Sequence, residues 1–339
     1  MMKGKLVMHT IKDVAKIAGV STSTVSRALS GNIPVNDDTK KRVLDAVKQL
    51  NYKPNFLAKG LKEGRSNAIG LIIPDIRNPI FPALARGVED TARSNGFNVI
   101  FSNSDENIEN EINSVNMLKN RWVDGFIFAT ASLDCQHIHQ LREENIPVVL
   151  MVRNIEESFD AVVTNNFEAS YNAVKYLIDR GLKKIAIING RLSLSLYRER
   201  YEGYKKALED HGIDFSEEIC FNCSMANGNC YEVVKNYFST HRDVDGVFAT
   251  NDSKAIEAIR AIKDVGLRVP TDISVIGFDD IQISALLDPQ LTTVAQPLYD
   301  MGKLAVEKLI KIINEKSKRK KKPQIDVVKS ELVIRNSTI

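Results

Sequence analysis

The 339-residue chain lacks any apolar run close to the roughly 20 residues that a membrane-spanning helix needs, which argues against a membrane protein. Its first ten residues contain two lysines and a histidine but no hydrophobic stretch of the kind that secretory signals carry. Cysteine is scarce as well, and the four cysteines suit reduced thiols rather than a disulfide framework. We therefore expect a soluble, cytoplasmic protein with no membrane partner.

The motifs of common enzyme classes are missing too. No GxGxxG, P-loop or GxSxG elbow occurs, and no pattern pairs a nucleophile with a base. Cys220 and Cys223 have the spacing of a metal or redox pair, but no histidine completes a zinc-finger pattern and the surroundings, 224–229, are loop-like. The sequence thus predicts no metal, no cofactor and no enzymatic activity, with an enzyme on an α/β body as a weaker alternative.

What the chain does contain is a segment, 10–30, with the pattern of two short helices around a turn. Thr10 and Asp13 are placed to cap the first helix, and Gly19 permits the turn. Ser21 can cap the second helix, whose apolar residues share one face while the other face carries hydroxyls and one guanidinium. Such a helix suits the DNA major groove, although any small helical hairpin also has a polar outer face.

Positive charge is concentrated at the same end of the chain. Residues 1–65 hold 13 Lys and Arg against 5 Asp and Glu, whereas the rest of the chain holds 33 against 38. A basic module on a mildly acidic body is typical of a protein that contacts phosphates. A third helix is expected to start at 36–39, to continue over 41–50 and to end before Pro54. The segment 55–63 is short enough to form only a marginal helix by itself.

From residue 67 the chain alternates β-branched apolar runs with amphipathic stretches, which indicates parallel sheets covered on both faces. Two successive series of this kind suggest two lobes, with a ligand site in the cleft beyond the carboxyl ends of the strands. Strands are expected at 69–73, 98–101, 125–128, 147–152, 184–188, 246–249 and 274–278, and helices at 83–95, 108–120, 170–180, 201–211 and 253–265.

Nine segments, in order along the chain, resemble the LacI/GalR family of bacterial transcription regulators. They include 10–30, Asn51–Asn55, IGLIIPDIRNPIF at 69–81, TND at 250–252 and RVPTDISVIGFDD at 268–280. The resemblance implies a DNA-binding regulator, a repressor of carbohydrate-metabolism genes. It implies a homodimer on a pseudo-palindromic operator, under allosteric control by a small sugar-like effector.

The resemblance also implies an architecture. An N-terminal all-α helix-turn-helix domain of three helices is expected over 1–54, and a hinge helix with its linker over 55–66. A two-lobed α/β body like that of periplasmic binding proteins, with parallel sheets, is expected over 67–339. Its N-lobe would comprise about 67–161 and 293–322, and its C-lobe about 162–292 and 323–339.

The same resemblance assigns DNA contacts. Base-reading positions are Thr22, Ser23 and Arg27. Positions that contact the DNA backbone, and so fix register without reading sequence, are Thr10, Ser21, Ser26, Asn36, Thr39, Tyr52 and Asn55. In the hinge, Leu61 matches a leucine wedged into the minor groove, with Ala58 and Lys62 beside it. Packing of Leu61 on the body is the alternative.

On the ligand side the resemblance implies effector contacts by Phe81, Arg200, Asn251, Phe278 and Asp279. For Phe278, packing in the core is an alternative of equal weight to a ligand contact. For Asp279, the alternative is that its side chain caps the turn after the strand.

Two positions depart from the family pattern, because Val152 and Asn165 stand where relatives often have Asp. Arg200 is kept, and Arg153, Arg191 and Arg198 are expected near the pocket. We therefore expect an effector of acidic character, such as a sugar phosphate or sugar acid.

Two other readings stay open: control by a phosphorylated carrier protein, and a solute-binding sensor without DNA function. The basic stretch 316–323 is expected to be a solvated loop. No leucine heptad extends the C-terminus, so the tetramer-forming tail of some relatives is expected to be absent.

Overall fold

The computed structural model divides into two compact units, Met1–Ser66 and Asn67–Ile339. It describes residues 9–30, 34–52, 65–130, 135–155, 158–223, 230–315 and 322–339. The predictions for Asn55, Ala58, Leu61 and Lys62, and those for 224–229 and most of 316–323, lie outside these residues.

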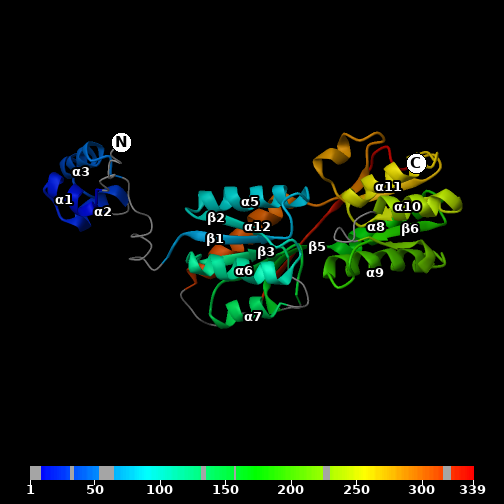
Figure 1. The fold of residues 1–339 in the computed structure, drawn as a ribbon, viewed down its shortest axis with the longest axis horizontal. Helices are drawn as coiled ribbons and strands as arrows, with labels where there is room; N and C mark the ends of the chain where they lie inside the picture. Colours follow the sequence, from blue (N-terminus) through cyan, green and yellow to red (C-terminus); the bar gives the residue numbers. More distant parts are fainter. Residues whose placement is uncertain are drawn as a thin grey trace, which may run out of the picture. The chain divides into compact units, whose positions relative to one another are not determined.

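The first unit contains α1 (Ile11–Ala18), α2 (Thr22–Ser30) and α3 (Asp37–Gln49) (Figure 1). Val14, Val25 and Val43 are fully buried, one from each helix, and form the centre of a small apolar core. Gly19 ends α1 with φ of +64°, a conformation that favours glycine. The predicted helix-turn-helix is therefore confirmed, and α3 begins within the expected start region, with Asn36 as its cap.

Caps explain where these helices begin. Asp13 accepts hydrogen bonds from the backbone N of Thr10 at 2.8 Å and from its hydroxyl at 2.9 Å. The Asn36 side chain accepts from the backbone N of Asp38 at 3.0 Å. The first N–H groups of a helix have no hydrogen-bond partner within the helix, and side chains at the helix start supply or orient such partners. These hydrogen bonds therefore favour helix starts at these positions.

The second unit contains two lobes, each built on a six-stranded sheet (Figure 1). The N-lobe sheet has the order β11-β5-β4-β3-β1-β2, and all its strand pairs are parallel. Its elements are β1 (Ala68–Ile73), α5 (Ile80–Ser94), β2 (Asn98–Asn103), α6 (Ile108–Asn120), β3 (Gly125–Phe128), α7 (Gln136–Glu143), β4 (Val148–Met151), β5 (Asp160–Thr164), α12 (Leu298–Asn314) and β11 (Ile325–Val328).

The C-lobe sheet has the order β12-β10-β9-β8-β6-β7, with only the β10–β12 pair antiparallel. Its elements are α8 (Asn166–Asp179), β6 (Ile185–Asn189), α9 (Ser195–Asp210), η2 (Glu217–Ile219), β7 (Cys220–Asn222), α10 (Cys230–Thr240), β8 (Gly246–Ala249), α11 (Asp252–Asp264), β9 (Ser274–Asp279), η4 (Gln282–Ala285), β10 (Thr292–Ala295) and β12 (Glu331–Val333). The predicted two-lobed α/β body with parallel sheets is confirmed.

Helices cover both faces of each sheet. In the N-lobe, α5 and α12 cover one face and α6 and α7 the other, and in the C-lobe α10 and α11 lie opposite α8 and α9 (Figure 1). The helices α5 and α12 approach so closely that a Cβ on Gly87 would lie 2.1 Å from the carbonyl oxygen of Tyr299. Glycine is thus required there for the backbones to pack.

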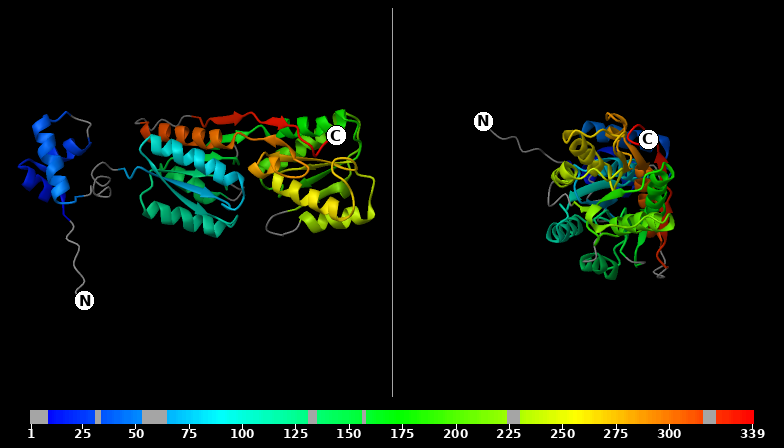
Figure 2. Two further views of the ribbon diagram at one scale, coloured as in Figure 1. Left: turned by 90° about the horizontal axis from the view of Figure 1, so that it is seen from above. Right: turned by 90° about the vertical axis from the view of Figure 1, so that its right-hand side faces the viewer.

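Over the described residues the chain crosses between the lobes three times, after β5, after β10 and after β11 (Figure 2). The expected lobe boundaries near 293 and 323 shift, because Thr292–Ala295 pairs with β9 of the C-lobe and Ile325–Val328 pairs with β5 of the N-lobe. At the first crossing, Asn165 Oδ1 accepts hydrogen bonds from the backbone N of Ser330 at 3.1 Å and from its hydroxyl at 2.8 Å. Asn165 thereby joins two crossings.

Several elements differ from those expected. The helices α8 and α9 begin at Asn166 and Ser195, before the apolar stretches that marked them, and α7 and α10 had no strong periodic signal. The short strand at Cys220–Asn222 was not among the expected strands. The helix α12 spans 17 residues, and no helix in the described ranges is long and apolar enough to cross a membrane.

Candidate nucleic-acid interface and ligand cleft

The helix α2 presents one polar face to solvent. Val25 and Ala28 are buried, whereas Thr22, Ser23, Ser26 and Arg27 are exposed. The apolar residues of the helix pack in the core of the first unit. The hydroxyls and the guanidinium on the opposite face therefore point outward together. The structure therefore brings all three predicted base-reading residues onto one accessible face.

Hydroxyl groups at the start of α2 form a small network. Ser21 Oγ accepts from the backbone N of Thr24 at 3.1 Å and lies 2.7 Å from Ser23 Oγ. The cap fixes Ser21 at the helix start, and the second contact orients Ser23 before any partner arrives. A pre-ordered side chain loses less entropy on binding.

Three of the predicted backbone-contacting residues are helix caps. Thr10, Ser21 and Asn36 stand at the starts of α1, α2 and α3. Unpaired N–H groups and the helix dipole make such positions favourable for phosphate oxygens. Thr39 and Tyr52 are half-buried, and the Thr39 hydroxyl accepts from Arg42 Nη2 at 3.5 Å.

In the second unit, a cavity of about 350 Å³ lies between the lobes and is called the cleft below. Residues at the carboxyl ends of β1, β4, β6, β8 and β9 line it: Pro74, Val152, Gly190, Asn251 and Asp279. This placement agrees with the expectation that ligands of open α/β sheets bind beyond the carboxyl ends of strands. Phe81, at the start of α5, adds an apolar wall and is 2% exposed.

Arg200 is held rigidly in the C-lobe wall of the cleft, although it is only 2% exposed. Its Nε donates to Asn166 Oδ1 at 2.9 Å, and its Nη1 donates to the carbonyl oxygen of Thr250 at 2.6 Å. The guanidinium also lies over the ring of Phe278, with 3.5 Å between Cζ and the ring centroid.

Phe278 itself is fully buried in the C-lobe core and does not line the cleft. Of its two expected roles, core packing is the one the structure shows, because the ring is covered by Arg200. The residue supports the arginine from beneath rather than forming a wall against a ligand.

Asp279 faces the cleft from the end of β9. Its Oδ1 accepts from Gln296 Nε2 at 2.7 Å and lies 3.8 Å from Arg200 Nη1. Burial raises the pKa of Asp279 to about 7, although Arg200 opposes the shift. Near neutral pH this carboxyl is present in both its protonated and its ionised form, so it can donate as well as accept hydrogen bonds.

Asn251 also lines the cleft, at the start of α11. Its Oδ1 accepts from the backbone N of Lys254 at 2.8 Å and caps the helix, so its remaining donor, Nδ2, points to Tyr197 Oη at 3.4 Å. Asn251 thus has both a structural role and a polar group toward the cavity.

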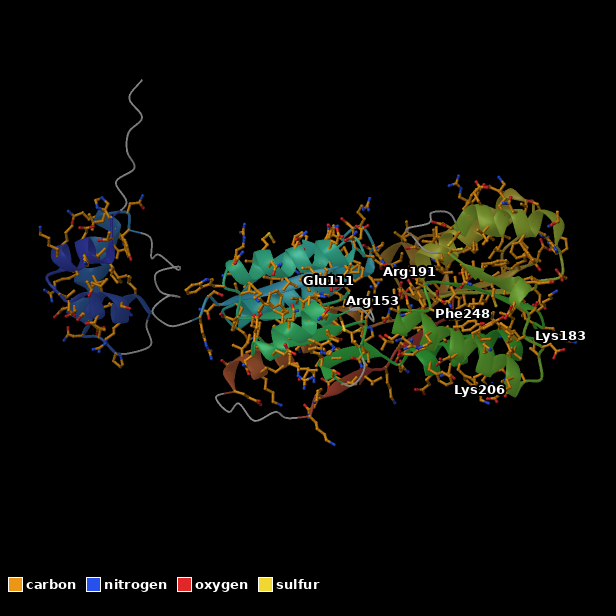
Figure 3. All side chains as sticks on the ribbon, turned by 60° about the horizontal axis from the view of Figure 1, so that its bottom comes forward. Glu111, Arg153, Lys183, Arg191, Lys206 and Phe248 are labelled. Carbon is orange, nitrogen blue, oxygen red and sulfur yellow. The ribbon has the colours of Figure 1, made fainter. Side chains whose placement is uncertain are left out.

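Glu106 joins two of the predicted cations across the cleft. Arg153 Nη2 donates to Glu106 Oε1 at 2.6 Å and its Nη1 to the carbonyl oxygen of Thr130 at 3.1 Å, while Arg191 of the C-lobe forms an ion pair with Glu106 Oε2. Figure 3 labels both arginines where the lobes adjoin. Their charges are therefore partly neutralised.

Val152 and Asn165, the two departures from the family pattern, lie in different parts of the structure. Val152 lines the cleft, so the pocket lacks a carboxylate there. Asn165 does not line it, because its side chain is used at the crossing to Ser330, and Arg198 is exposed on α9 outside the cavity. The cleft therefore lacks an acidic side chain at one of these two positions rather than at both.

Sequence reasoning did not single out Glu106, Tyr197 or Lys254, all of which line the cleft. For Lys254 a signal was present, because it follows Asn251 by three residues in a helix and so lies on the same face. For Glu106 and Tyr197 the sequence offers no comparable signal, since each reaches the cleft from a loop or helix start.

The cysteines do not form a metal site in the described ranges. All four are free thiols, and no group of three or more His, Cys, Asp or Glu side chains suited to a metal ion is present among these residues. Cys223 lines the cleft, and a hydrogen bond with Cys230 lowers the pKa of its thiol. Cys220 instead lies in β7.

Comparison with known proteins gives consistent matches over nearly the whole chain. Residues 10–55 match the family described as bacterial regulatory proteins, lacI family, and 66–333 match periplasmic binding proteins and sugar binding domain of LacI family. The chain is 38% identical to the HTH-type transcriptional regulator RegA of Clostridium saccharobutylicum, over 97% of this chain and 99% of that protein.

Two further relatives agree. The ribose operon repressor of Halalkalibacterium halodurans is 38% identical, over 98% of this chain and 97% of that protein. Among solved structures, the lac repressor dimer bound to operator and the anti-inducer ONPF superposes with a TM-score of 0.85 at 26% identity, covering 98% of this chain and 99% of that one.

Proposed function

The chain belongs to the LacI family of bacterial regulators and is a DNA-binding transcriptional regulator, and we propose that it is a homodimeric repressor of carbohydrate-metabolism genes. The observation that carries this proposal is the exposed face of α2, where hydroxyls and one guanidinium stand together on a helix of a basic unit. We assign no catalytic step to the protein.

In this proposal 1–54 is the DNA-binding domain, 55–66 the hinge and 67–339 the regulatory body. Thr22, Ser23 and Arg27 read base edges in the major groove, where Arg binds guanine through two hydrogen bonds. The caps at Thr10, Ser21 and Asn36, with Ser26, Thr39, Tyr52 and Asn55, fix the unit on phosphates. Two copies on one duplex would read two inverted half-sites, as a twofold protein requires.

The cleft is the proposed site of a sugar-like effector. Arg200, Asn251 and Asp279 supply donors and acceptors from the C-lobe, and Phe81 supplies an apolar wall from the N-lobe. The ribose operon repressor and the lac repressor complex with ONPF are relatives whose names point to such ligands. A rigid, paired arginine beside a carboxyl that can donate suits recognition of neighbouring hydroxyls.

Control of DNA binding follows from linkage between the two sites. An effector that favours one arrangement of the lobes must change DNA affinity by the ratio of its affinities for the two arrangements. The three crossings, with Asn165 bound to Ser330, are the places where such a rearrangement must bend the chain.

A gel-shift experiment tests the proposal. The full chain and a chain without residues 1–65 are compared on duplexes from the region upstream of the protein's own gene and on unrelated DNA of equal length. We expect retention of the upstream duplex by the full chain alone. Equal behaviour of the two proteins would overturn the proposal and favour a solute sensor without DNA function.

A further inference from the structure

Lys254 is a buried cation that faces the cleft. The residue is 4% exposed and lines the cavity from the first turns of α11. Within the described part of the chain its ammonium group forms no hydrogen bond and no ion pair. The nearest interaction is with the ring of Tyr197, whose centroid lies 4.4 Å from Nζ.

The other cations of the cleft already have anionic or carbonyl partners. Arg77 is paired with Asp75, Arg153 and Arg191 with Glu106, and Arg200 with Asp279 and the Thr250 carbonyl. Among the described residues that line the cleft, Lys254 is thus the cation without such a partner.

An ammonium removed from water without a counter-charge is unfavourable, and a single aromatic contact offsets only part of that cost. The nearby acid does not supply the missing charge, because burial raises the pKa of Asp279 to about 7 and leaves it partly protonated at neutral pH. The cleft wall therefore holds an unsatisfied positive charge where a ligand would lie.

A second donor stands beside it. The Tyr197 hydroxyl accepts from Asn251 Nδ2 at 3.4 Å, which leaves its own proton for a ligand. The position of the ring depends on Gly190, because a Cβ there would lie 2.4 Å from the Tyr197 ring. Burial alone would raise the pKa of Tyr197, but Lys254, Arg153 and Arg200 outweigh it and lower the pKa overall.

We propose that Lys254, with the Tyr197 hydroxyl as second donor, is a subsite for an anionic group of the effector, a phosphate or a carboxylate. The cavity of about 350 Å³ is near the lower end of small-molecule sites and suits a compound of monosaccharide size. The inference rests on the proposed function, since it takes the cleft as the effector site, and it identifies the effector as a polyol that carries an anion.

Thermal unfolding of the full-length protein tests this without knowledge of the effector. The shift of the unfolding midpoint of the body is measured in inorganic phosphate against chloride at equal ionic strength, for wild type, Lys254→Met, Lys254→Arg and Lys263→Met. Lys263 lies on the same helix but donates to the Asp288 carbonyl outside the cleft. Acetate in place of phosphate shows whether a carboxylate serves as well.

We expect phosphate or acetate to stabilise wild type, Lys254→Arg and Lys263→Met, and to have a much smaller effect on Lys254→Met. In chloride, Lys254→Met should melt at the same temperature as wild type or higher, because an unpaired buried charge is removed. An equal response to the anions in Lys254→Met, or a lower melting point in chloride, would overturn the inference and assign Lys254 to packing on Tyr197.

Matched ligand pairs extend the test. Titration calorimetry with ribose and ribose 5-phosphate, and with glucose and glucose 6-phosphate, should show about tenfold tighter binding of the phosphorylated member in wild type, and Lys254→Met should lose that preference. Tighter binding of the neutral member would contradict the subsite. If the protein retains DNA in the gel shift while these tests fail, only the anionic subsite is wrong. If it retains no DNA, the proposed function fails separately.

Discussion

Glu106 of the N-lobe forms an ion pair with Arg191 of the C-lobe, so a carboxylate spans the two lobes across the cleft. The same carboxylate accepts from the buried Arg153 at 2.6 Å. Glu106, Arg153 and Arg191 all line the cleft, so a ligand bound there would lie beside this ion pair between the lobes. We expect this ion pair to couple occupancy of the cleft to the arrangement of the lobes, if a ligand binds differently to two such arrangements.

Glu106→Gln should lower the free energy of unfolding by about 1–2 kcal/mol, because it leaves the buried Arg153 without its counter-charge. The loss is smaller than for a fully buried pair, since the Glu106 side chain is 32% exposed. Urea unfolding measures it. Glu144→Gln, which removes the surface partner of Lys119, is the control and should cost less than about 1 kcal/mol. Equal losses would contradict the role of Glu106.

Phe278→Leu should weaken effector binding because it removes the ring beneath Arg200. Phe248→Leu is a matched control: both rings are fully buried in the same C-lobe core, and Phe248 does not contact the cleft. Each variant should lose about 1–3 kcal/mol of stability, but only Phe278→Leu should reduce the affinity for effector in titration calorimetry. A similar loss of affinity in both would indicate a general effect of core packing.

The stability of the body should depend on pH through Asp279. Its pKa in the folded protein is about 7, whereas the pKa of an Asp in an unfolded chain is about 4. Between these values the folded state keeps a proton that the unfolded state has released, so the contribution of this carboxyl to stability falls as pH rises.

Asp279→Asn removes that ionisation. Relative to wild type, the unfolding free energy of the variant should increase from about pH 5 to about pH 8, by on the order of a few kcal/mol. The control is Asp272→Asn. Arg268 lowers the pKa of Asp272 to about 2. The contribution of Asp272 to stability is therefore lost only as pH falls toward this value, and it stays constant over the tested range. Parallel pH profiles of wild type and Asp279→Asn would contradict the shift.

Arg27→Ala should relax base preference at one position of each half-site, at a cost of about 1–3 kcal/mol on the preferred sequence. Tyr52→Phe, at a position assigned to the DNA backbone, should instead weaken all sequences alike. Fluorescence anisotropy on the preferred duplex and on single-base variants separates the two effects. A uniform loss from Arg27→Ala would show that α2 is placed wrongly on the DNA.

The first unit was predictable because its determinants are local. Thr10 with Asp13, Gly19 and Ser21 act within one or two helical turns, and the structure shows the capping contacts and the turn that these residues imply. Short elements such as α7 and β7 were missed because a segment of so few residues shows no clear periodicity of apolar side chains.

The cleft was only partly predictable because its geometry depends on long-range contacts. The bond of Asn165 to Ser330 joins residues far apart in the chain, and no local pattern reveals it. Phe278 and Asp279 are neighbours in a strand buried on both faces, so the sequence alone did not show which side chain faces the ligand. Lys254 could have been found from its helical spacing to Asn251.

The most direct test of the account is selection of bound sequences from a library of random duplexes by the full-length protein. We predict enrichment of two inverted half-sites with a shared spacing, and loss of preference at one position of each half-site when Arg27→Ala replaces wild type. Absence of enrichment, or enrichment that is the same for a chain without residues 1–65, would contradict it.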